Sequence, residues 1–277
     1  RGFLAGAGEG LAGRHGPGYS LGWQESVTSG AEGDAYGRGQ ELARTGRDAQ
    51  ARDAFAQAVE SRPSHAAARK QLGDVLLRMG QAEPALGEFA EAARLNPTDA
   101  EALRRTGEVL ELLGRDEEAL GAYSKALALR KDDAEIMNRL GDLYYKTYRY
   151  DSALDVYRAA VQLAPERSQN AEIWFKMGFI HESSGSSDEA ILAYEKASEL
   201  NPSHSGVHVA LANLYMSIGL RDEARIQFQR ALANNPSDSA GLFGLGVLAM
   251  EEKNPAEAVE AFQKAVALDA EDSDAFL

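Results

Sequence analysis

An alanine, an aromatic residue four positions later and another alanine three positions after that recur seven times along this chain. Successive copies are 34 residues apart, with one interval of 37 residues. A fixed period of this size is typical of repeat proteins, in which each repeat is one supersecondary unit that stacks on its neighbours. The pattern therefore predicts an extended array instead of one deep core. The seven triplets are Ala51/Phe55/Ala58, Ala85/Phe89/Ala92, Ala119/Tyr123/Ala126, Ala153/Tyr157/Ala160, Ala190/Tyr194/Ala197, Ala224/Phe228/Ala231 and Ala258/Phe262/Ala265.

The residues before each triplet predict a helical hairpin. A small residue stands twelve positions before the first alanine, as Gly39 does before Ala51. Spacings of three and four residues place side chains on one stripe of a helix. Small residues on two facing helices let the backbones approach closely, and the aromatic ring then fills the remaining space. A glycine such as Gly46 fits the turn after the first helix, although Tyr148 and Lys253 replace it in two repeats.

These columns resemble the tetratricopeptide repeat (TPR), a helical hairpin with the same period. In the fifth copy, Trp174 and Gly178 match the first half of the family signature, and Tyr194 and Pro202 match the second half. The resemblance implies an all-α fold, a right-handed superhelical solenoid of seven helix-turn-helix repeats. The predicted array covers residues 32–272, with repeats at 32–65, 66–99, 100–133, 134–170, 171–204, 205–238 and 239–272.

The two ends of the chain do not follow the repeat. Residues 1–31 are rich in glycine and have no helical period, so we predict a flexible segment there. Residues 273–277 match the first positions of an eighth repeat, with Phe276 in the tryptophan column, and we predict the start of a truncated further helix. We therefore expect the chain to be a piece of a longer protein. The alternative is a natural C-terminus that packs as a short stub.

Composition argues against several classes of partner. The chain has 29 Lys and Arg residues against 43 Asp and Glu residues, a net charge of −14, which disfavours nucleic acid and anionic membrane surfaces. No apolar run approaches the ~18 residues of a spanning helix, so we expect no membrane insertion. The absence of cysteine excludes disulfides, thiolate metal sites and a cysteine nucleophile. We expect a cytoplasmic location, with the periplasm as the alternative.

Short motifs for chemistry have simpler explanations. Residues 18–22 fit the G-x-S-x-G pattern, but no strand precedes them and no helix follows, so we interpret them as a chance match. His204 and His208 are four residues apart, a spacing that can hold a metal on one helix face. No carboxylate completes that set, and His208 stands in the tryptophan column, which favours a buried histidine with a hydrogen-bond partner. We predict no catalytic residue, metal or cofactor.

The TPR resemblance implies that a partner protein or peptide lies along the concave groove, which the first helices line. In repeats two to four this lining is mixed and charged. A merely solvated face explains it as well as a binding role does. The predicted partner-binding residues of this polar half are Lys70, Arg78, Arg104, Asn138, Tyr145 and Lys146.

In repeats five to seven the same positions are mostly apolar. Exposed apolar side chains of this kind usually mark a contact site, and aromatic and methionine side chains are typical anchors. We predict that this apolar half receives an apolar segment such as an amphipathic helix. The alternative is that further chain or a second copy fills it, through self-association at the uncapped C-terminal end. The predicted residues of the apolar half are Phe175, Phe179, Val209, Asn213, Met216, Phe243, Val247 and Met250.

The residues and the family resemblance together predict a non-catalytic scaffold or adaptor for protein–protein interaction, of a bacterial style. The alternative from another class is a regulatory or targeting segment of a larger enzyme or signalling protein, whose catalytic domain lies outside this chain. A family resemblance alone does not separate these two functions.

Overall fold

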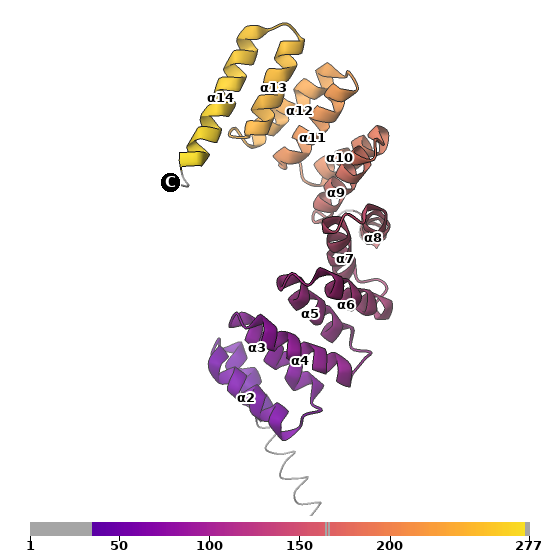
Figure 1. Ribbon diagram of the computed structural model, residues 1–277, viewed down its shortest axis with the longest axis vertical. Coiled ribbons are helices and arrows are strands. Elements are labelled where there is room, and N and C mark those ends of the chain that lie inside the picture. The colour runs from indigo at the N-terminus through magenta and orange to yellow at the C-terminus, as the bar shows by residue number, and fades with distance from the viewer. Residues whose placement is uncertain (1–34, 164, 166, 275–277) are drawn as a thin grey trace, which may run out of the picture. The chain divides into compact units, whose positions relative to one another are not determined.

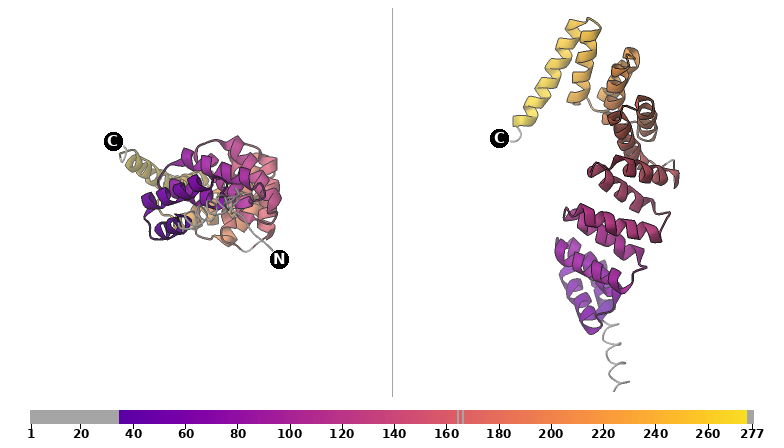
Figure 2. Two further views of the ribbon diagram at one scale, coloured as in Figure 1. Left: turned by 90° about the horizontal axis from the view of Figure 1, so that it is seen from below. Right: turned by 45° about the vertical axis from the view of Figure 1, so that its right-hand side comes forward.

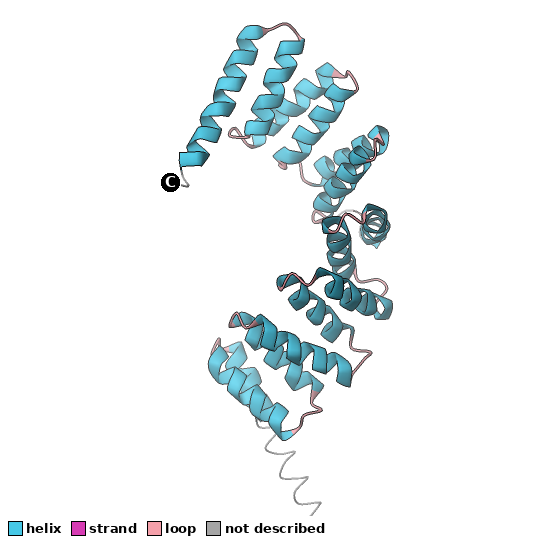
Figure 3. Ribbon diagram, viewed as in Figure 1, coloured by secondary structure: helices cyan, strands magenta, loops and turns pink. Residues whose placement is uncertain are grey.

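The computed structural model describes residues 35–163, 165 and 167–274. Within these residues every regular element is a helix (Figure 3), which confirms the all-α prediction. Residues 35–44 form the first helix, ahead of those labelled in Figure 1. The labelled helices are α2 (Asp48–Ser61), α3 (Ala66–Arg78), α4 (Ala82–Leu95), α5 (Ala100–Leu112), α6 (Asp116–Leu129), α7 (Ala134–Lys146), α8 (Tyr150–Leu163), α9 (Asn170–Ser183), α10 (Ser187–Leu200), α11 (Ser205–Ser217), α12 (Arg221–Asn234), α13 (Ser239–Glu251) and α14 (Pro255–Asp274).

Each predicted repeat is a hairpin of two helices joined by a tight turn. The turn residue takes a left-handed backbone conformation, which glycine adopts without strain. Around Gly80, whose φ is +74°, the amide of Gln81 donates to the carbonyl of Leu76 at 2.8 Å. This bond satisfies a carbonyl that the end of α3 would otherwise leave unpaired. Tyr148 and Lys253 adopt the same conformation without being glycine, with φ of +60° and +59°.

The described helices divide into two compact units, one ending at Leu129 and the other beginning at Arg130. In the first unit, α2 packs against α3 and α4 packs against α5. In the second unit, α8 packs against α9, α10 against α11, and α12 against α13. The orange and yellow hairpins of the second unit can be followed one after the other in the right-hand view of Figure 2. Each unit is therefore a stack of hairpins in which a second helix lies between two first helices.

The core of each hairpin follows the predicted columns. A Cβ added to Gly107 would lie 2.8 Å from Cε1 of Tyr123, and one added to Gly141 would lie 2.5 Å from Cε1 of Tyr157. Real Cβ atoms do not approach a ring this closely, so glycine is required for the ring to fit. The triplet residues themselves are almost completely buried, except Phe262 of the seventh repeat, which is half-buried. The close approach between first and second helix is thus confirmed.

Acidic side chains begin several of the first helices. Asp99 accepts hydrogen bonds from the backbone amides of Glu101 and Ala102, both at 3.1 Å. Asp133 caps α7 in the same way. Such caps satisfy amides at a helix start and place negative charge at the positive end of the helix dipole.

The last helix is longer than the others. It runs from Pro255 to Asp274 and passes through Ala270, where most other repeats have a proline that ends the helix. Ser273 and Asp274 therefore belong to α14. Residues 275–277 and the predicted flexible segment 1–31 lie outside the described residues, so the predictions for both ends stay predictions.

Candidate partner-binding surfaces

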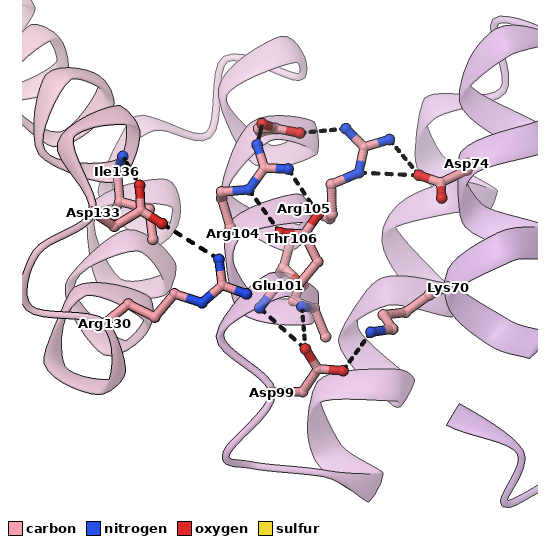
Figure 4. Close-up of polar contacts among 12 residues, drawn as sticks. Lys70, Asp74, Asp99, Glu101, Arg104, Arg105, Thr106, Arg130, Asp133 and Ile136 are labelled. Carbon is pink, nitrogen blue, oxygen red and sulfur yellow. Dashed lines mark hydrogen bonds and ion pairs between the residues drawn. The ribbon is translucent and has the colours of Figure 1, made fainter. Parts of the chain in front are cut away.

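The three cations of the predicted polar half that lie in the first unit are each paired with a carboxylate. The amino group of Lys70 lies 2.6 Å from Oδ2 of Asp99, the residue that caps α5 (Figure 4). Burial tends to raise the pKa of Asp99, but the hydrogen bonds from Lys70 and from the α5 amides outweigh it and lower the pKa. Arg78 pairs with Asp48 of the preceding repeat at 2.7 Å. These pairs tie neighbouring elements of the chain together.

Arg104 and Arg105 belong to a network on α5. Arg104 contacts Glu101 at 2.7 Å and also pairs with Glu108. Arg105 contacts Glu108 at 2.5 Å and donates from Nε to Asp74 of α3 at 3.0 Å (Figure 4). The Arg105 guanidinium also lies 5.3 Å from the centre of the Phe89 ring. Because each cation already has a carboxylate partner, an acidic ligand would have to displace those carboxylates to bind here.

The other three residues of the polar half lie on α7, in the second unit. Asn138 is half-buried, and its Oδ1 has no hydrogen-bond partner among the described residues. Lys146 is exposed at the end of the helix. Tyr145 is half-buried and lies 5.9 Å, between ring centres, from Phe179 of the predicted apolar half. The structure thus brings one residue of each predicted half together.

Tyr145 and Phe179 are part of a larger aromatic cluster. The ring of Tyr150 lies 5.8 Å from that of Tyr145 and 6.1 Å from that of Tyr148. We call Tyr145, Tyr148, Tyr150 and Phe179 the aromatic patch. It gathers side chains from α7, the turn after it, the start of α8, and α9. Its most exposed members are Tyr148, which is 79% exposed, and Phe179, which is 41% exposed.

The predicted apolar half divides into packed and exposed residues. Val209 is buried in the core of α10–α12, and Phe175 and Met216 pack against that core. Phe243 and Met250 of α13 remain 58% and 56% exposed. The remaining two are Val247, which is half-buried, and Asn213, which is exposed. Apart from Phe179, Phe243 and Met250 are therefore the residues of this half whose exposed apolar surface a partner could bury most.

Two hollows were not predicted from the sequence. One, of about 900 Å³, lies on α4, α5 and α6, where small residues such as Ala90, Gly121 and Ala128 leave the second helices uncovered. A stripe of small residues at exposed helix positions was the signal that could have indicated it. The other, of about 630 Å³, lies on α13 and α14 between Phe243, Phe262 and Val266.

The two histidines considered for a metal have other partners. His204 caps α11, since its Nδ1 accepts from the amide of Val207 at 3.2 Å. His208 is buried, and its ring nitrogens lie 2.8 Å from Oε1 of Gln227 and 3.0 Å from the carbonyl of Pro202. The prediction of a buried, hydrogen-bonded histidine at position 208 is confirmed. Within the part of the chain that the structure describes, no group of three or more potential ligands converges.

Comparison with known proteins identifies the family. A model described as tetratricopeptide repeat matches residues 36–92, 70–134 and 209–273, and a second model of that description matches residues 132–203. The chain belongs to the tetratricopeptide repeat family. The curated proteins include no match to this TPR sequence.

Solved structures show the same TPR solenoid. A fragment of MamA from Desulfovibrio magneticus has 26% identity over 62% of this chain and 96% of its own, with a TM-score of 0.56. YrrB, described as a TPR protein with an unusual peptide-binding site, has 23% identity over 65% of this chain and 91% of its own, with a TM-score of 0.56. The C-terminal part of a TPR protein from Cytophaga hutchinsonii has 13% identity over 85% of this chain and 95% of its own, with a TM-score of 0.71.

The length and composition of the helices also bear on whether one of them could span a membrane. Across the described residues, no helix combines the length and the apolar character that a bilayer-spanning segment needs.

Proposed function

We propose that this TPR array is a non-catalytic scaffold that binds a partner protein or peptide on the first helices of its second unit. The observation that carries the proposal is the exposure of Phe243 and Met250 after the core of the stack is complete. Burying one such side chain against a partner contributes roughly 1.5–3 kcal/mol. TPR proteins act in protein interactions, and YrrB is described as having a peptide-binding site.

The charged face of the first unit supports a structural role better than a binding role. Lys70, Arg78 and Arg104 hold carboxylates of their own chain at 2.6 or 2.7 Å. Removing a cation from such a network exposes a carboxylate without its partner, which costs stability before any binding is affected. We therefore place the partner on the second unit.

The proposal extends to the origin of the protein and to its location in the cell. The similarity to MamA from Desulfovibrio magneticus supports a bacterial origin. We propose a cytoplasmic scaffold. The alternative of a regulatory segment within a larger enzyme stays a hypothesis, and the reading frame of the parent gene would decide it.

The test compares two matched double variants as baits in lysate of the source organism. The anchor variant is Phe243→Ser/Met250→Ser, which removes two exposed apolar side chains from a first helix. The control variant is Leu192→Ser/Val259→Ser, which removes two side chains of similar exposure, 62% and 53%, from second helices. Circular dichroism verifies that both baits keep their helices. Phe179 is left unchanged because it is less exposed than Phe243 and packs against Tyr145. The ring of Phe243 lies 5.4 Å from that of Phe262, which is why the anchor variant must be shown to keep its fold.

A partner captured by the wild type and the control variant, but not by the anchor variant, supports the proposal. Its affinity for the purified chains then gives the contribution of the two side chains. Identical capture by all three baits would overturn the proposal, since Phe243 and Met250 would then have no role in binding.

A further inference from the structure

Among the described residues, α13 and α14 are not covered by a following first helix, and they lie side by side at the yellow end of Figure 1. Val266 is 66% exposed, whereas Val161, at the same position of the fourth repeat, is 6% exposed. Val259 is 53% exposed, whereas the equivalent Leu154 is 8% exposed. Both residues of the fourth repeat lie on α8, which packs against α9. We call Phe243, Val247, Val259, Phe262 and Val266 the end face.

The hollow of about 630 Å³ on α13 and α14 lies within this end face. The ring of Phe262 beside it is half-buried, while the equivalent ring of Phe228 in the sixth repeat is completely buried. In the sixth repeat, α12 packs against α13 of the next repeat. The end face is therefore the surface on which the sixth repeat carries a further helix.

The sixth repeat shows how a helix lies on such a face, with positions counted from the first residue of each repeat. The third residue of the covering helix meets position 28, since a Cβ added to Gly241 would lie 3.4 Å from Cδ2 of Leu232. The sixth residue, Gly244, meets the ring of Phe228. The tenth residue, Leu248, is completely buried in the same core. The covering helix thus buries residues i, i+3 and i+7, which form one stripe.

The outer two residues of this stripe are small or apolar in every first helix from α3 to α13, and all of them are buried. On the end face, Val266 takes the place of Leu232, so a covering helix needs the same two residue types there. The pairs in the chain are Ala68/Val75, Ala102/Val109, Ile136/Leu143, Ile173/Ile180, Val207/Leu214 and Gly241/Leu248.

The middle residue of the stripe depends on the charge at the ninth position of the preceding repeat. Arg105 donates to Asp74 at 3.0 Å, and Lys176 donates to Asp142 at 2.9 Å. Where the ninth residue is acidic, the sixth residue of the next repeat is basic, and where it is uncharged, so is the sixth residue. The pairs are Gln40/Gln71, Asp74/Arg105, Glu108/Arg139, Asp142/Lys176, Phe179/Ala210 and Asn213/Gly244.

The end face has Val247 at this ninth position. A cation on a covering helix would therefore face a valine instead of a carboxylate, and burying a charge without a partner is costly. The last two pairs of the chain show what replaces the cation beside an uncharged residue, namely Ala210 and Gly244. The end face thus favours a small uncharged residue at i+3.

A second copy of this chain does not present the pattern on a free helix among its described residues. The first helices α3 to α13 already bury these positions against their own chain. The helix of residues 35–44 has Glu41 at the tenth position, exposed and 2.8 Å from Arg44. Moving this ion pair onto an apolar surface would remove it from water without a new partner. The pattern therefore favours a different protein.

We propose that the end face binds an amphipathic helix of a partner protein, antiparallel to α14, with a small or apolar residue at i, a small uncharged residue at i+3 and an aliphatic residue at i+7. The inference rests on the proposed function and names the chemistry of the segment that covers Phe243. Residue i lies against Val266, and residue i+3 lies over the ring of Phe262.

The test uses labelled helical peptides in fluorescence anisotropy titrations with the whole chain. Each peptide has alanine at i, leucine at i+7 and a lactam bridge on its outer face that keeps it helical. The alanine peptide has alanine at i+3, and the arginine peptide has arginine there. We expect the alanine peptide to bind at least about tenfold more tightly, the effect of one good anchor position. Moving the leucine to the opposite helix face should abolish binding.

Three variants assign the binding to the end face. Val247→Asp recreates the ninth position of the second and fourth repeats, so this variant should prefer the arginine peptide. Val266→Asp places a charge against residue i and should weaken the alanine peptide about tenfold. Leu192→Asp changes a residue of similar exposure, 62%, on α10, and should bind as the wild type does. Circular dichroism verifies that all three variants keep their helices.

Equal affinity for the alanine and arginine peptides, an unchanged preference in Val247→Asp, or unchanged binding in Val266→Asp would overturn the proposal. Analytical ultracentrifugation of the whole chain tests the competing occupant. A dimer that Val266→Asp converts to a monomer would overturn the proposal in favour of a second copy.

The anchor variant separates these outcomes from failure of the proposed function. Lost lysate capture by the anchor variant, without binding of the alanine peptide to the wild type, rejects the end-face proposal alone. Peptide binding with the expected preferences, together with identical capture by all three baits, rejects the role of Phe243 and Met250 in capture alone.

Discussion

The ring of Phe228 fills the space that a side chain on Gly244 would need. A Cβ built on Gly244 meets Cε1 of Phe228 at 2.2 Å, which is closer than at any other glycine in the described residues. In the other repeats, the glycine that receives the ring lies on the first helix of the same hairpin, as Gly178 does for Tyr194. Repeat six has Ala212 there, and α13 of the next repeat supplies the missing space.

Gly244→Ala should therefore lower the free energy of unfolding by about 1–3 kcal/mol through overpacking. The ring of Phe228 is completely buried, so moving it would displace neighbouring core side chains. Urea unfolding followed by circular dichroism measures the change.

Gly87 gives the matched control for this substitution. It lies in the interior of α4, and a Cβ added to it meets no atom within 4 Å. Gly87→Ala should raise the free energy of unfolding by about 0.4–1 kcal/mol, because alanine restricts the unfolded chain. If Gly244→Ala stabilises the array as much as Gly87→Ala does, the steric argument is wrong.

At the two strained turns, substitution by glycine should raise the free energy of unfolding. Tyr148→Gly and Lys253→Gly should each relieve about 1–2 kcal/mol of backbone strain and lose about 0.4–1 kcal/mol to the greater freedom of the unfolded chain. For Lys253→Gly the free energy of unfolding should therefore rise by roughly 0.5–1 kcal/mol. The gain for Tyr148→Gly should be smaller, because this variant also loses the ring contact with Tyr150. Thermal or urea unfolding of the two variants measures it.

Gly114→Ala tests the same turn in the opposite direction. Gly114 has a φ of +71°, so alanine there should be destabilising by about 1 kcal/mol. A destabilised Lys253→Gly variant would count against the strain, since Lys253 is exposed and its side chain carries no ring contact.

The repeat columns predicted the fold because each column is a local steric requirement. Gly107 and Tyr123 must approach within one hairpin, so their spacing appears in every copy. The compensation of Ala212 by Gly244 could not be predicted in the same way. It depends on a contact between two hairpins, and the sequence shows it at one place only.

The candidate site was harder to predict because one column contains residues with different burial. Val209 and Phe243 occupy the same position in successive repeats, yet the first is buried and the second is largely exposed. Their difference depends on how neighbouring hairpins cover them. The contact of Tyr145 with Phe179 follows from the repeat register, since the two positions face each other in adjacent repeats. The contact was not predicted because Tyr145 and Phe179 were assigned to different halves of the groove.

The pair of Lys70 and Asp99 predicts a loss of stability in acid. The folded-state pKa of Asp99 is lowered, so the carboxylate contributes stability above its ordinary pKa of about 3.9. This contribution is lost as the pH falls below that value and through the folded-state pKa. Both side chains are mostly buried, and we expect a contribution of roughly 1 kcal/mol.

Asp99→Asn isolates the charge in this experiment. Asparagine still caps a helix well, so the variant loses the ion pair and keeps the cap. It should be less stable than the wild type near neutral pH and should lose less stability between about pH 5 and pH 2. Parallel acid profiles of the wild type and the variant would contradict the assignment to Asp99.

The buried tyrosines predict the opposite limit, a loss of stability in base. Burial, together with the adjacent carboxylate, raises the pKa of Tyr157 and of Tyr194 well above the ordinary value, and raises that of Tyr215 to about 12. Such a group stabilises the fold fully below the unfolded-state pKa of about 10, and the contribution declines as the pH rises above it. Tyrosinate absorbance should therefore rise in two steps, the exposed residues first and the buried ones together with the loss of helical circular dichroism. Tyr194→Phe should lower the free energy of unfolding by about 1 kcal/mol near neutral pH, because the hydrogen bond to Glu182 is lost. Between neutral and strongly basic pH, this variant should lose less of its free energy of unfolding than the wild type does. Complete tyrosinate formation while the helical signal is unchanged would show that these hydroxyls are accessible in the folded state.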